Sequence, residues 1–405
     1  MDRMAAHYLY IGVLNTIAFI SIPFLFKEVA IKDLFNNYPT MIYGGFIIFS
    51  SISLVNSINI IESLVELNQI ITFFFSLVIV IFLSKAKLIK INFLLLLVIL
   101  TLVFDLAISL INYVDIILTK GTKFEYTEIP YLLGLYGNRN ILAITIAMRI
   151  PFVILFSIRL NKLTPYLLSF ILVSLSFYTL ILLSSRTSFL GVILSLIFII
   201  GFLFYRLYFL KRTLFSNHKH LFFLYLAPLL LAYFISTKTI STTDRAAVTE
   251  RVSAIVDTDD RSRQTRFRYY KQALETIKES PVFGIGLGNW KIYSIKKDSQ
   301  NIRSYIIPYN VHNDILEFTA ETGIIGGIFF LSFFIYLALF VLKDLNLNPK
   351  DLYLDNYSLF IMLPFILYFT DLNLNFPSTR PENLYLLLIY IAYVFSTKYQ
   401  LDDKE

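Results

Sequence analysis

The sequence predicts an all-α protein, a polytopic transmembrane helical bundle of about 11 to 12 spans, with one long extramembrane loop that contains short amphipathic helices. Hydrophobic residues make up 57% of the 405 residues, and the mean hydropathy is +0.69. Both values are typical of polytopic membrane proteins. Apolar runs of roughly 20 residues, the length that crosses a bilayer as a helix, recur along the whole chain.

Composition also limits the chemistry. The chain has no cysteine, which excludes disulfides, thiolate catalysis and cysteine metal sites. Its formal charge of +7 suits contact with anionic lipid headgroups or with a phosphorylated ligand. The segment Met1 to Lys27 lacks a basic start and a small-residue cleavage pattern, so we expect no cleavable signal peptide.

The apolar runs place the expected spans, from the first to the last, near residues 7–26, 41–58, 69–84, 91–113, 140–158, 165–184, 187–206, 220–237, 315–342, 356–371 and 382–396. We therefore divide the chain into N-terminal transmembrane helices, central transmembrane helices with outer-face arginines, the long outer loop, and C-terminal helices with a short cytoplasmic tail. These regions are residues 1–136, 137–236, 237–312 and 313–405.

Lysine and arginine residues in the short loops predict the orientation of the bundle. They fall on every second connection, which the positive-inside rule assigns to the cytoplasm. The alternate connections, and with them the long loop, then lie outside, and an odd number of spans puts Met1 outside as well. The cytoplasmic residues are Lys85, Lys87, Lys90, Arg159, Lys162, Arg206, Lys211, Arg212, Lys219, Lys343 and Lys350.

This orientation gathers polar motifs on the outer face. Arg139 and Asn140 open the fifth span, Arg186 joins the sixth to the seventh, and Arg380 joins the tenth to the eleventh. We expect them to converge with Arg266 and His312 of the long loop, the latter being one of only four histidines.

Two of the membrane arginines allow alternative interpretations. An arginine at or inside a span is costly unless it snorkels or has a partner. Arg186 can therefore bind a ligand or reach outer-leaflet phosphate. Arg149, directly before Ile150 and Pro151, can face a wet interior or bond the carbonyls freed by Pro151, and we favour the second.

The sequence of the long loop predicts an amphipathic helix that lies over the membrane face. Asp259 to Ser262 is typical of a helix start, and apolar residues at helical spacing continue to Pro281; they are Phe267, Tyr270, Leu274 and Ile277. Its first turns carry Arg263, Arg266 and Arg268, where free N–H groups also favour an anion. The alternative is an interfacial helix that rests on headgroups.

The glycines that follow, Gly284, Gly286 and Gly288, predict a tight bend, because the preceding strand and the spacing of a dinucleotide-binding motif are missing.

His312 stands at the mouth of a span, with carboxylates on the next turns. Glu317 and Glu321 are four residues apart and share a helix face. Gly323 and Gly326 are expected to permit close helix packing. A lone histidine with scattered carboxylates has no metal-ligand spacing, so no metal is expected. A hydrogen-bonding structural role for His312 is the alternative to catalysis.

Together these motifs resemble the O-antigen ligase and polymerase superfamily of membrane glycosyltransferases. The resemblance rests on His312-Asn313 followed by Gly323 and Gly326, and on the order arginine, aromatic residue, Pro-x-x-Gly-x-Gly in the long loop. In this chain that order is Arg266, Tyr270, Pro281, Gly284 and Gly286, with Tyr270 in place of the usual tryptophan. The similarity extends over about residues 137–330, and the N-terminal spans match only in hydrophobicity.

The resemblance implies a bacterial inner-membrane enzyme with its active site on the periplasmic side, and no cofactor. The donor would be an undecaprenyl-diphosphate-linked glycan, and the acceptor lipid A-core or another glycan. Membrane lipids are further partners, and no nucleic acid is expected. Catalysis would fall to His312, Arg186 and Arg266. Substrate binding would fall to Arg139, Asn140, Arg263, Arg268, Asn313, Glu317, Glu321 and Arg380.

Within the superfamily a ligase is favoured over a polymerase or a protein O-oligosaccharyltransferase. The alternative from another class is a transporter of lipid-linked glycan. Transporters often consist of paired halves and bind at mid-membrane. This chain shows no internal repeat, and its polar residues are expected on one face, which argues against transport.

Overall fold

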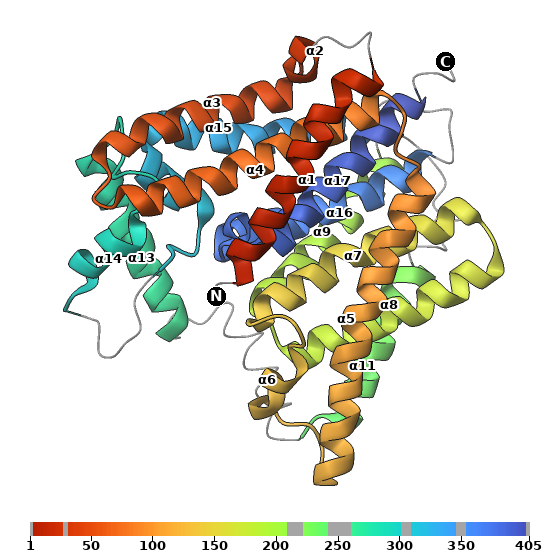
Figure 1. Cartoon of the computed structure of the whole chain (residues 1–405). Helices are drawn as coiled ribbons and strands as arrows, with labels where there is room; N and C mark the ends of the chain where they lie inside the picture. The colour runs from red at the N-terminus through yellow and green to blue at the C-terminus, as the bar shows by residue number, and fades with distance from the viewer. Residues whose placement is uncertain are drawn as a thin grey trace. The chain divides into compact units, whose positions relative to one another are not determined.

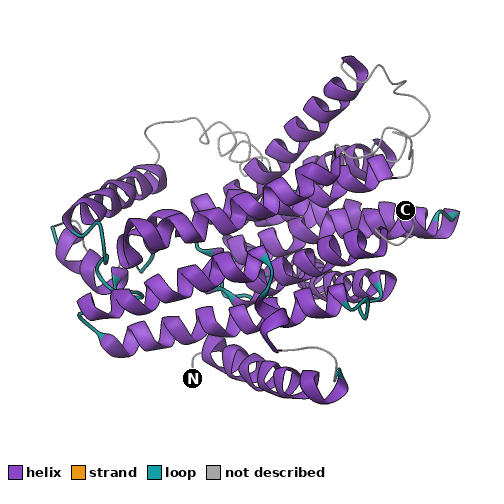
Figure 2. Cartoon of the chain, turned by 90° about the horizontal axis from the view of Figure 1, so that it is seen from above, coloured by secondary structure: helices purple, strands orange, loops and turns teal. Residues whose placement is uncertain are grey.

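The computed structural model describes residues 3–26, 31–208, 222–241, 261–300, 309–345 and 354–401. Within these ranges the chain consists of helices joined by loops (Figure 2), and the only extended pairing is an isolated parallel bridge between Phe124 and Ile240. The helices form two compact units. The first contains Met1–Leu88, Thr258–Phe340 and Leu372–Glu405, and the second contains Ile89–Asp257 and Val341–Asp371.

The first unit combines membrane helices with the helices of the long loop (Figure 1). Its helices are α1 (Arg3–Leu25), α2 (Ile31–Phe35), α3 (Tyr38–Ser53), α4 (Ile60–Lys85), α13 (Arg261–Glu279), α14 (Trp290–Asp298), most of α15 (Asp314–Leu345) and α17 (Pro381–Leu401). Short 3-10 turns, η1 (Leu54–Asn56) and η4 (Pro377–Thr379), precede α4 and α17.

The second unit contains α5 (Ile91–Lys120), α6 (Ile129–Leu132), α7 (Arg139–Leu160), α8 (Leu163–Leu183), α9 (Arg186–Tyr208), α11 (Ala227–Thr239) and most of α16 (Leu354–Leu374). Helix α7 is its centre, because nearly every residue from Leu142 to Ile158 is buried. Helices α5, α8 and α9 all pack against it.

The predicted fold class is confirmed. Among the described residues, eight helices are long and apolar enough to cross a membrane, and they coincide with the predicted spans 7–26 to 187–206 and 315–342. The predicted spans 220–237 and 356–371 correspond to shorter apolar helices, Phe223–Thr239 and Leu359–Leu374. The predicted span 382–396 lies in α17, which is not among the eight.

Asparagine side chains begin four of the long helices. Asn37, Asn59 and Asn138 accept hydrogen bonds from the first N–H groups of α3, α4 and α7. Asn313 does the same for α15 through Leu316 N, at 3.0 Å. Because these donors have no partner inside the helix, the caps fix where each helix starts.

Side-chain contacts identify the two ends of the first unit. At one end, Nδ1 of His7 in α1 lies 3.6 Å from the Glu382 carboxylate at the start of α17. At the other end, Ser396 of α17 donates to Ser84 of α4 at 3.0 Å. The start of α1 therefore lies at the same end as the start of α17.

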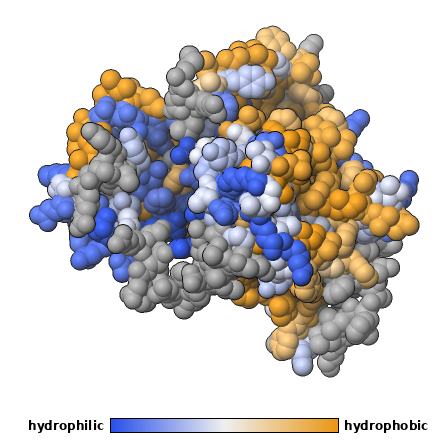
Figure 3. All heavy atoms as spheres, turned by 90° about the horizontal axis from the view of Figure 1, so that it is seen from below, coloured by the Kyte–Doolittle hydropathy of each residue, from blue (hydrophilic) through white to orange (hydrophobic). Residues whose placement is uncertain are grey.

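The surface agrees with a membrane environment. Large apolar side chains remain open along the spans, for example Leu9 at 71% and Leu118 at 77% exposure. Broad areas of the surface seen from below are hydrophobic (Figure 3). Such exposure is stable in lipid and unfavourable in water.

The expectation for Arg149 is wrong. Its guanidinium forms a buried ion pair with Asp105 of α5, and the same carboxylate accepts a hydrogen bond from the Tyr136 hydroxyl at 2.9 Å. A charge inside the membrane is stabilised most by an opposite charge, and Asp105 provides one where the carbonyls near Pro151 would provide only dipoles.

Candidate active site

The predicted loop helix exists as α13, but a different side of it is buried. Tyr269, Ala273 and Thr276 are buried, whereas Phe267 and Leu274 of the predicted apolar side are 56% and 49% exposed. Tyr269 and Ala273 pack in one cluster with Trp290 and other apolar residues. The tryptophan at the start of α14 therefore decides which side of α13 faces inward.

The predicted bend at the glycines also exists. Gly284, Gly286 and Gly288 all have positive φ angles. At Gly286, with φ of +94°, a Cβ atom would lie 2.3 Å from the Ser57 hydroxyl oxygen. Only glycine combines this backbone conformation with so close an approach.

The segment from Gly284 to Gly288, the glycine loop, supplies hydrogen bonds to α15 where this helix is broken at Gly323 (φ 79°, ψ 172°). The break frees two carbonyl groups, and the loop supplies their donors: Ile285 N bonds Ala320 O and Gly286 N bonds Glu321 O, both at 3.0 Å. In return Ile324 N bonds Pro281 O at 2.8 Å. Gly323 therefore serves loop docking, and its expected role in helix packing is wrong.

A polar network fastens the same loop to the start of α4. Asn289 Oδ1 accepts from Asn59 N at 2.8 Å, and Asn289 Nδ2 donates to the Ser63 hydroxyl at 2.7 Å. Asn56 Nδ2 donates to Gly284 O at 3.0 Å. The sequence did not single out these N-terminal residues, because short polar side chains at a span end are also ordinary helix caps.

The two carboxylates of α15 face the protein's own backbone. Glu317 accepts from Val311 N at 2.7 Å and from Asn310 Nδ2 at 3.2 Å. Glu321 accepts from Trp290 N at 2.8 Å. Both are buried. Glu317 therefore holds the segment before His312, and Glu321 holds the start of α14. That either carboxylate also contacts substrate stays a prediction.

His312 lies in the loop that these carboxylates hold. Its backbone is left-handed, with φ of 62°, which is uncommon for a residue other than glycine. Its carbonyl accepts a hydrogen bond from the Tyr270 hydroxyl at 3.0 Å, and that hydroxyl also lies 3.1 Å from the Asn373 carbonyl. Its ring contacts Phe376, with 5.2 Å between the ring centres. The buried Nδ1 atom has no hydrogen-bond partner among the described residues.

Burial, and then the positive charge of Arg266, lower the pKa of His312 to about 4. This pKa is well below the ordinary value of a histidine, near 6.5. The ring is neutral at neutral pH, so a nitrogen lone pair is available to accept a proton. Arg266 Nη2 is 3.5 Å from Asn375 Oδ1, so this guanidinium reaches the connection between α16 and α17.

Two further predicted residues, Asn313 and Arg380, lie near His312, together with Asp314. Asn313 caps α15 and its Nδ2 donates to Asn373 O at 3.3 Å. Asp314 accepts from Ser378 N at 2.8 Å. The Arg380 guanidinium lies 4.9 Å from the centre of the Phe376 ring. The structure thus brings His312, Arg266, Asn313 and Arg380 together at one end of the first unit, from three separate segments of the chain.

Arg268 has a partner within the protein. Its Nε and Nη2 atoms lie 2.8 and 3.1 Å from the two oxygens of Asp298, a forked geometry that suits a carboxylate. Asp298 is buried and also accepts from Gln272 at 3.0 Å. Arg268 therefore joins α13 to α14. The side chain of Arg263 lies outside the described residues.

The remaining predicted residues belong to the second unit. Asn140 Oδ1 accepts a hydrogen bond from the Ser185 hydroxyl at 3.0 Å, which joins the start of α7 to the start of α9. Arg139 and Arg186 are the first residues of these two helices and are partly exposed. That they border one cavity with His312 and Arg266 stays a prediction.

Comparison with known families agrees with these positions. Residues 170–331 match the family model O-antigen ligase. The matched range contains Arg186, α13 with Arg266, the glycine loop and His312. The resemblance found in the sequence is confirmed for this range, so the chain carries a domain of the ligase and polymerase type of membrane glycosyltransferase. No curated protein matches the chain.

Proposed function

We propose that this chain transfers a glycan from an undecaprenyl diphosphate carrier to an acceptor hydroxyl, on the periplasmic side of the bacterial inner membrane. The acceptor hydroxyl oxygen bonds to the anomeric carbon of the glycan's reducing end. The bond from that carbon to the diphosphate oxygen breaks, and undecaprenyl diphosphate leaves. The acceptor proton passes to His312. The products are the glycosylated acceptor and the free lipid diphosphate.

The observation that carries the proposal is the state of His312. A neutral imidazole can accept a proton, and a donor diphosphate beside Arg266 would raise the pKa of His312 from about 4 toward the range that suits a base. The ring is also held in one place, because Phe376 contacts the imidazole and the Tyr270 hydroxyl bonds the backbone carbonyl of His312. A positioned base of this kind contributes typically 10²- to 10⁴-fold to a rate.

Arginine stabilises the leaving group in this proposal. Arg266 lies at the same end of the first unit as His312, and its positive charge lowers the pKa of the histidine ring. A guanidinium can hold two diphosphate oxygens at once and can stabilise the charge that grows as the carbon–oxygen bond breaks. Arg186 is assigned to catalysis and Arg139 to substrate binding, each from a helix start of the second unit. No metal is required for these steps.

We assign the acceptor to lipid A-core, as in an O-antigen ligase. A polymerase, which would use a second lipid-linked glycan, and a protein O-oligosaccharyltransferase are the alternatives within the same chemistry. Purified protein should be offered a defined lipid-linked donor with lipid A-core, a second donor molecule or a peptide in separate reactions. Product with lipid A-core alone supports the ligase assignment, and product with another acceptor alone contradicts it.

The role of His312 is tested by His312→Asn. We expect donor binding and the melting temperature to change little, while turnover falls by about 10²-fold or more. A structural role would lower stability and donor binding together. Full turnover by the variant would contradict the assignment of the base. Movement of donor across the bilayer without any glycosidic product would instead favour a transporter.

The role of arginine is tested by Arg266→Ala, Arg266→Lys and the control Arg159→Ala. Arg159 is partly exposed and bonds Asn92 near the end of α7 that is opposite to Arg139, so its loss should leave transfer unchanged. Arg266→Ala should lose most transfer, and lysine should restore only part because it lacks the forked geometry. Loss of transfer with EDTA and recovery with a divalent ion would contradict the arginine mechanism.

A further inference from the structure

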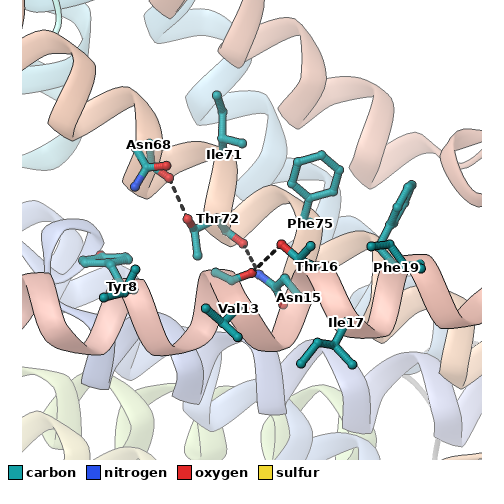
Figure 4. Close-up of a pocket in the computed structure, with 13 residues that line it drawn as sticks. Tyr8, Val13, Asn15, Thr16, Ile17, Phe19, Asn68, Ile71, Thr72 and Phe75 are labelled. Carbon is teal, nitrogen blue, oxygen red and sulfur yellow. Dashed lines mark hydrogen bonds between the residues drawn. The ribbon is translucent and has the colours of Figure 1, made fainter.

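A groove of about 610 Å³ opens between α1 and α4 of the first unit (Figure 4). Its walls are mostly apolar and include Leu9, Val13, Ile17 and Ile20 of α1, and Ile71 and Phe75 of α4. The walls remain open to the surroundings, because Val13 and Ile17 are 51% and 58% exposed. Both helices are long and apolar enough to cross the membrane, so the groove opens toward lipid.

Three polar side chains of the groove, those of Asn15, Thr16 and Thr72, form hydrogen bonds within the protein. Asn15 Nδ2 lies 2.8 Å from both the Thr72 carbonyl and the Ser76 hydroxyl. Thr16 donates to Gly12 O at 2.8 Å, and Thr72 donates to Asn68 O at 2.7 Å. A ligand therefore meets mainly hydrocarbon. Such a surface suits a lipid chain and offers little to a sugar or a headgroup.

One end of the groove lies at the end of the unit that holds His312. Tyr8 lines that end, and its neighbour His7 pairs with Glu382. Two residues before Glu382, Arg380 stacks on Phe376, whose ring contacts His312. From Tyr8 to Ile20 the groove follows α1 for about 18 Å. That is more than half of a bilayer core of about 30 Å.

We propose that this groove binds the polyisoprenoid chain of the glycan donor. The inference rests on the proposed function, because a diphosphate held beside Arg266 must have its lipid chain in the bilayer below the same end of the unit. The groove starts there and continues into the membrane, and its mostly apolar walls match a chain without hydrogen-bonding atoms. Bulk phospholipid and a second copy of the protein are the competing occupants.

The test fills the groove at Gly12. A Cβ atom at Gly12 would meet no heavy atom within 4 Å, so Gly12→Leu should fold normally and place its side chain in the groove. Gly201→Leu in α9 is the matched control, because Gly201 is equally open and lies in the other unit. Transfer is measured with a C55 donor and with a C10 donor that carries the same glycan.

We expect Gly12→Leu to raise KM for the C55 donor by about tenfold or more, because the displaced chain loses apolar contact area. KM for the C10 donor, and kcat for both donors, should change less than about twofold. Gly201→Leu should match the wild type with both donors. An unchanged KM for the C55 donor, or an equal rise for both donors, would overturn the assignment.

A photocrosslinking residue in place of Ile17 identifies the occupant directly. The proposal is supported if the residue captures the C55 donor and if excess unlabelled C55 lipid diphosphate suppresses this capture. Capture of phospholipid that the donor does not displace, or of a second copy of the chain, overturns it. If the wild-type protein forms no product from either donor, the proposed function fails, and the crosslink still decides whether the groove binds a polyisoprenoid.

Discussion

Tyr270 is the residue whose hydroxyl ties α13 to the backbone of His312. Tyr270→Phe removes this hydroxyl and keeps the ring, so the carbonyls of His312 and Asn373 lose a donor. We expect a fall in kcat with little change in KM, and a loss of about 1 kcal/mol in stability. Steady-state kinetics and a melting curve measure both quantities.

Tyr293→Phe provides the control for that experiment. Its hydroxyl donates to the Glu279 carboxylate at 2.9 Å in an exposed position, and not to the backbone of His312. Removing it should leave kcat unchanged. If Tyr293→Phe and Tyr270→Phe lowered kcat equally, the loss of any loop-helix hydroxyl would explain the effect, and the positioning role of Tyr270 would be wrong.

His312 also predicts a pH dependence that changes with donor binding. In the free protein its pKa is about 4, so the acid limb of kcat/KM should lie well below pH 6.5. The donor diphosphate brings negative charge beside Arg266, which favours protonated histidine and raises its pKa. The acid limb of kcat should therefore lie at a higher pH than that of kcat/KM. Coincident limbs, or a reversed order, would contradict this account.

The pKa of His312 also affects stability. The unfolded chain binds a proton at this residue near pH 6.5, whereas the folded protein does so only near pH 4. Protonation therefore favours unfolding, and this contribution to stability decreases as the pH falls from about 6.5 to about 4. The melting temperature of His312→Asn should fall less over that range than that of the wild type.

Residue identities could be predicted from the sequence more readily than residue partners. His312 and Arg266 could be singled out because a histidine and a basic helix start are rare in a chain so apolar. The partners of Glu317 and Glu321 could not, because they depend on how the loop folds back over α15. The pKa of His312 could not be predicted for the same reason, since burial is its main cause.

At the scale of elements, the break in α15 is the feature with the largest expected mutational effect. A Cβ atom at Gly323 would lie 2.1 Å from the Val282 carbonyl oxygen, at a φ of +79°. Gly323→Ala must therefore displace the glycine loop, at a cost of about 3 kcal/mol or more. A melting curve should show a large loss of stability, and transfer should fall with it.

Gly121→Ala separates the cost of conformation from the cost of the clash. Gly121 has a similar φ of +63°, but a Cβ atom there would meet nothing within 4 Å. Its replacement should cost only about 1 kcal/mol. Equal losses for the two variants would show that the docking of the loop against α15 contributes little.

Helix positions could be predicted because apolar length and asparagine caps are local signals, as at Asn138 before α7. The buried side of α13 could not be predicted in this way. Phe267 and Leu274 follow the helical period, but the partners of the helix, Trp290 and Val311, are not its sequence neighbours. The break at Gly323 was missed because a glycine inside an apolar run also suits close helix packing.

At the scale of the whole molecule, the contact between α1 and α17 predicts which side of the membrane each end of the first unit faces. The pair between His7 and Glu382 requires the start of α1 to lie on the same side as Arg380 and the candidate site. We expect a tag before α1 to be accessible from outside, and a phosphatase that needs export to be active when fused after Ser299. The same phosphatase fused after Lys87 should be inactive.

The opposite pattern at all three positions would place His312 and Arg266 in the cytoplasm and contradict the periplasmic reaction. If the tag before α1 and the phosphatase after Ser299 lay on opposite sides of the membrane, the contact between His7 and Glu382 would be contradicted instead. The three fusions therefore separate the orientation of the molecule from the packing of α1.

The pairing of Ser84 with Ser396 has a consequence for biogenesis. These partners are 312 positions apart, and synthesis at about 5 to 20 residues per second separates them by roughly 15 to 60 s. During that interval α1 and α4 are already in the bilayer, while the ribosome makes the bulk of the other unit. The early helices must then stay in the bilayer with lipid against the surface that α17 later covers.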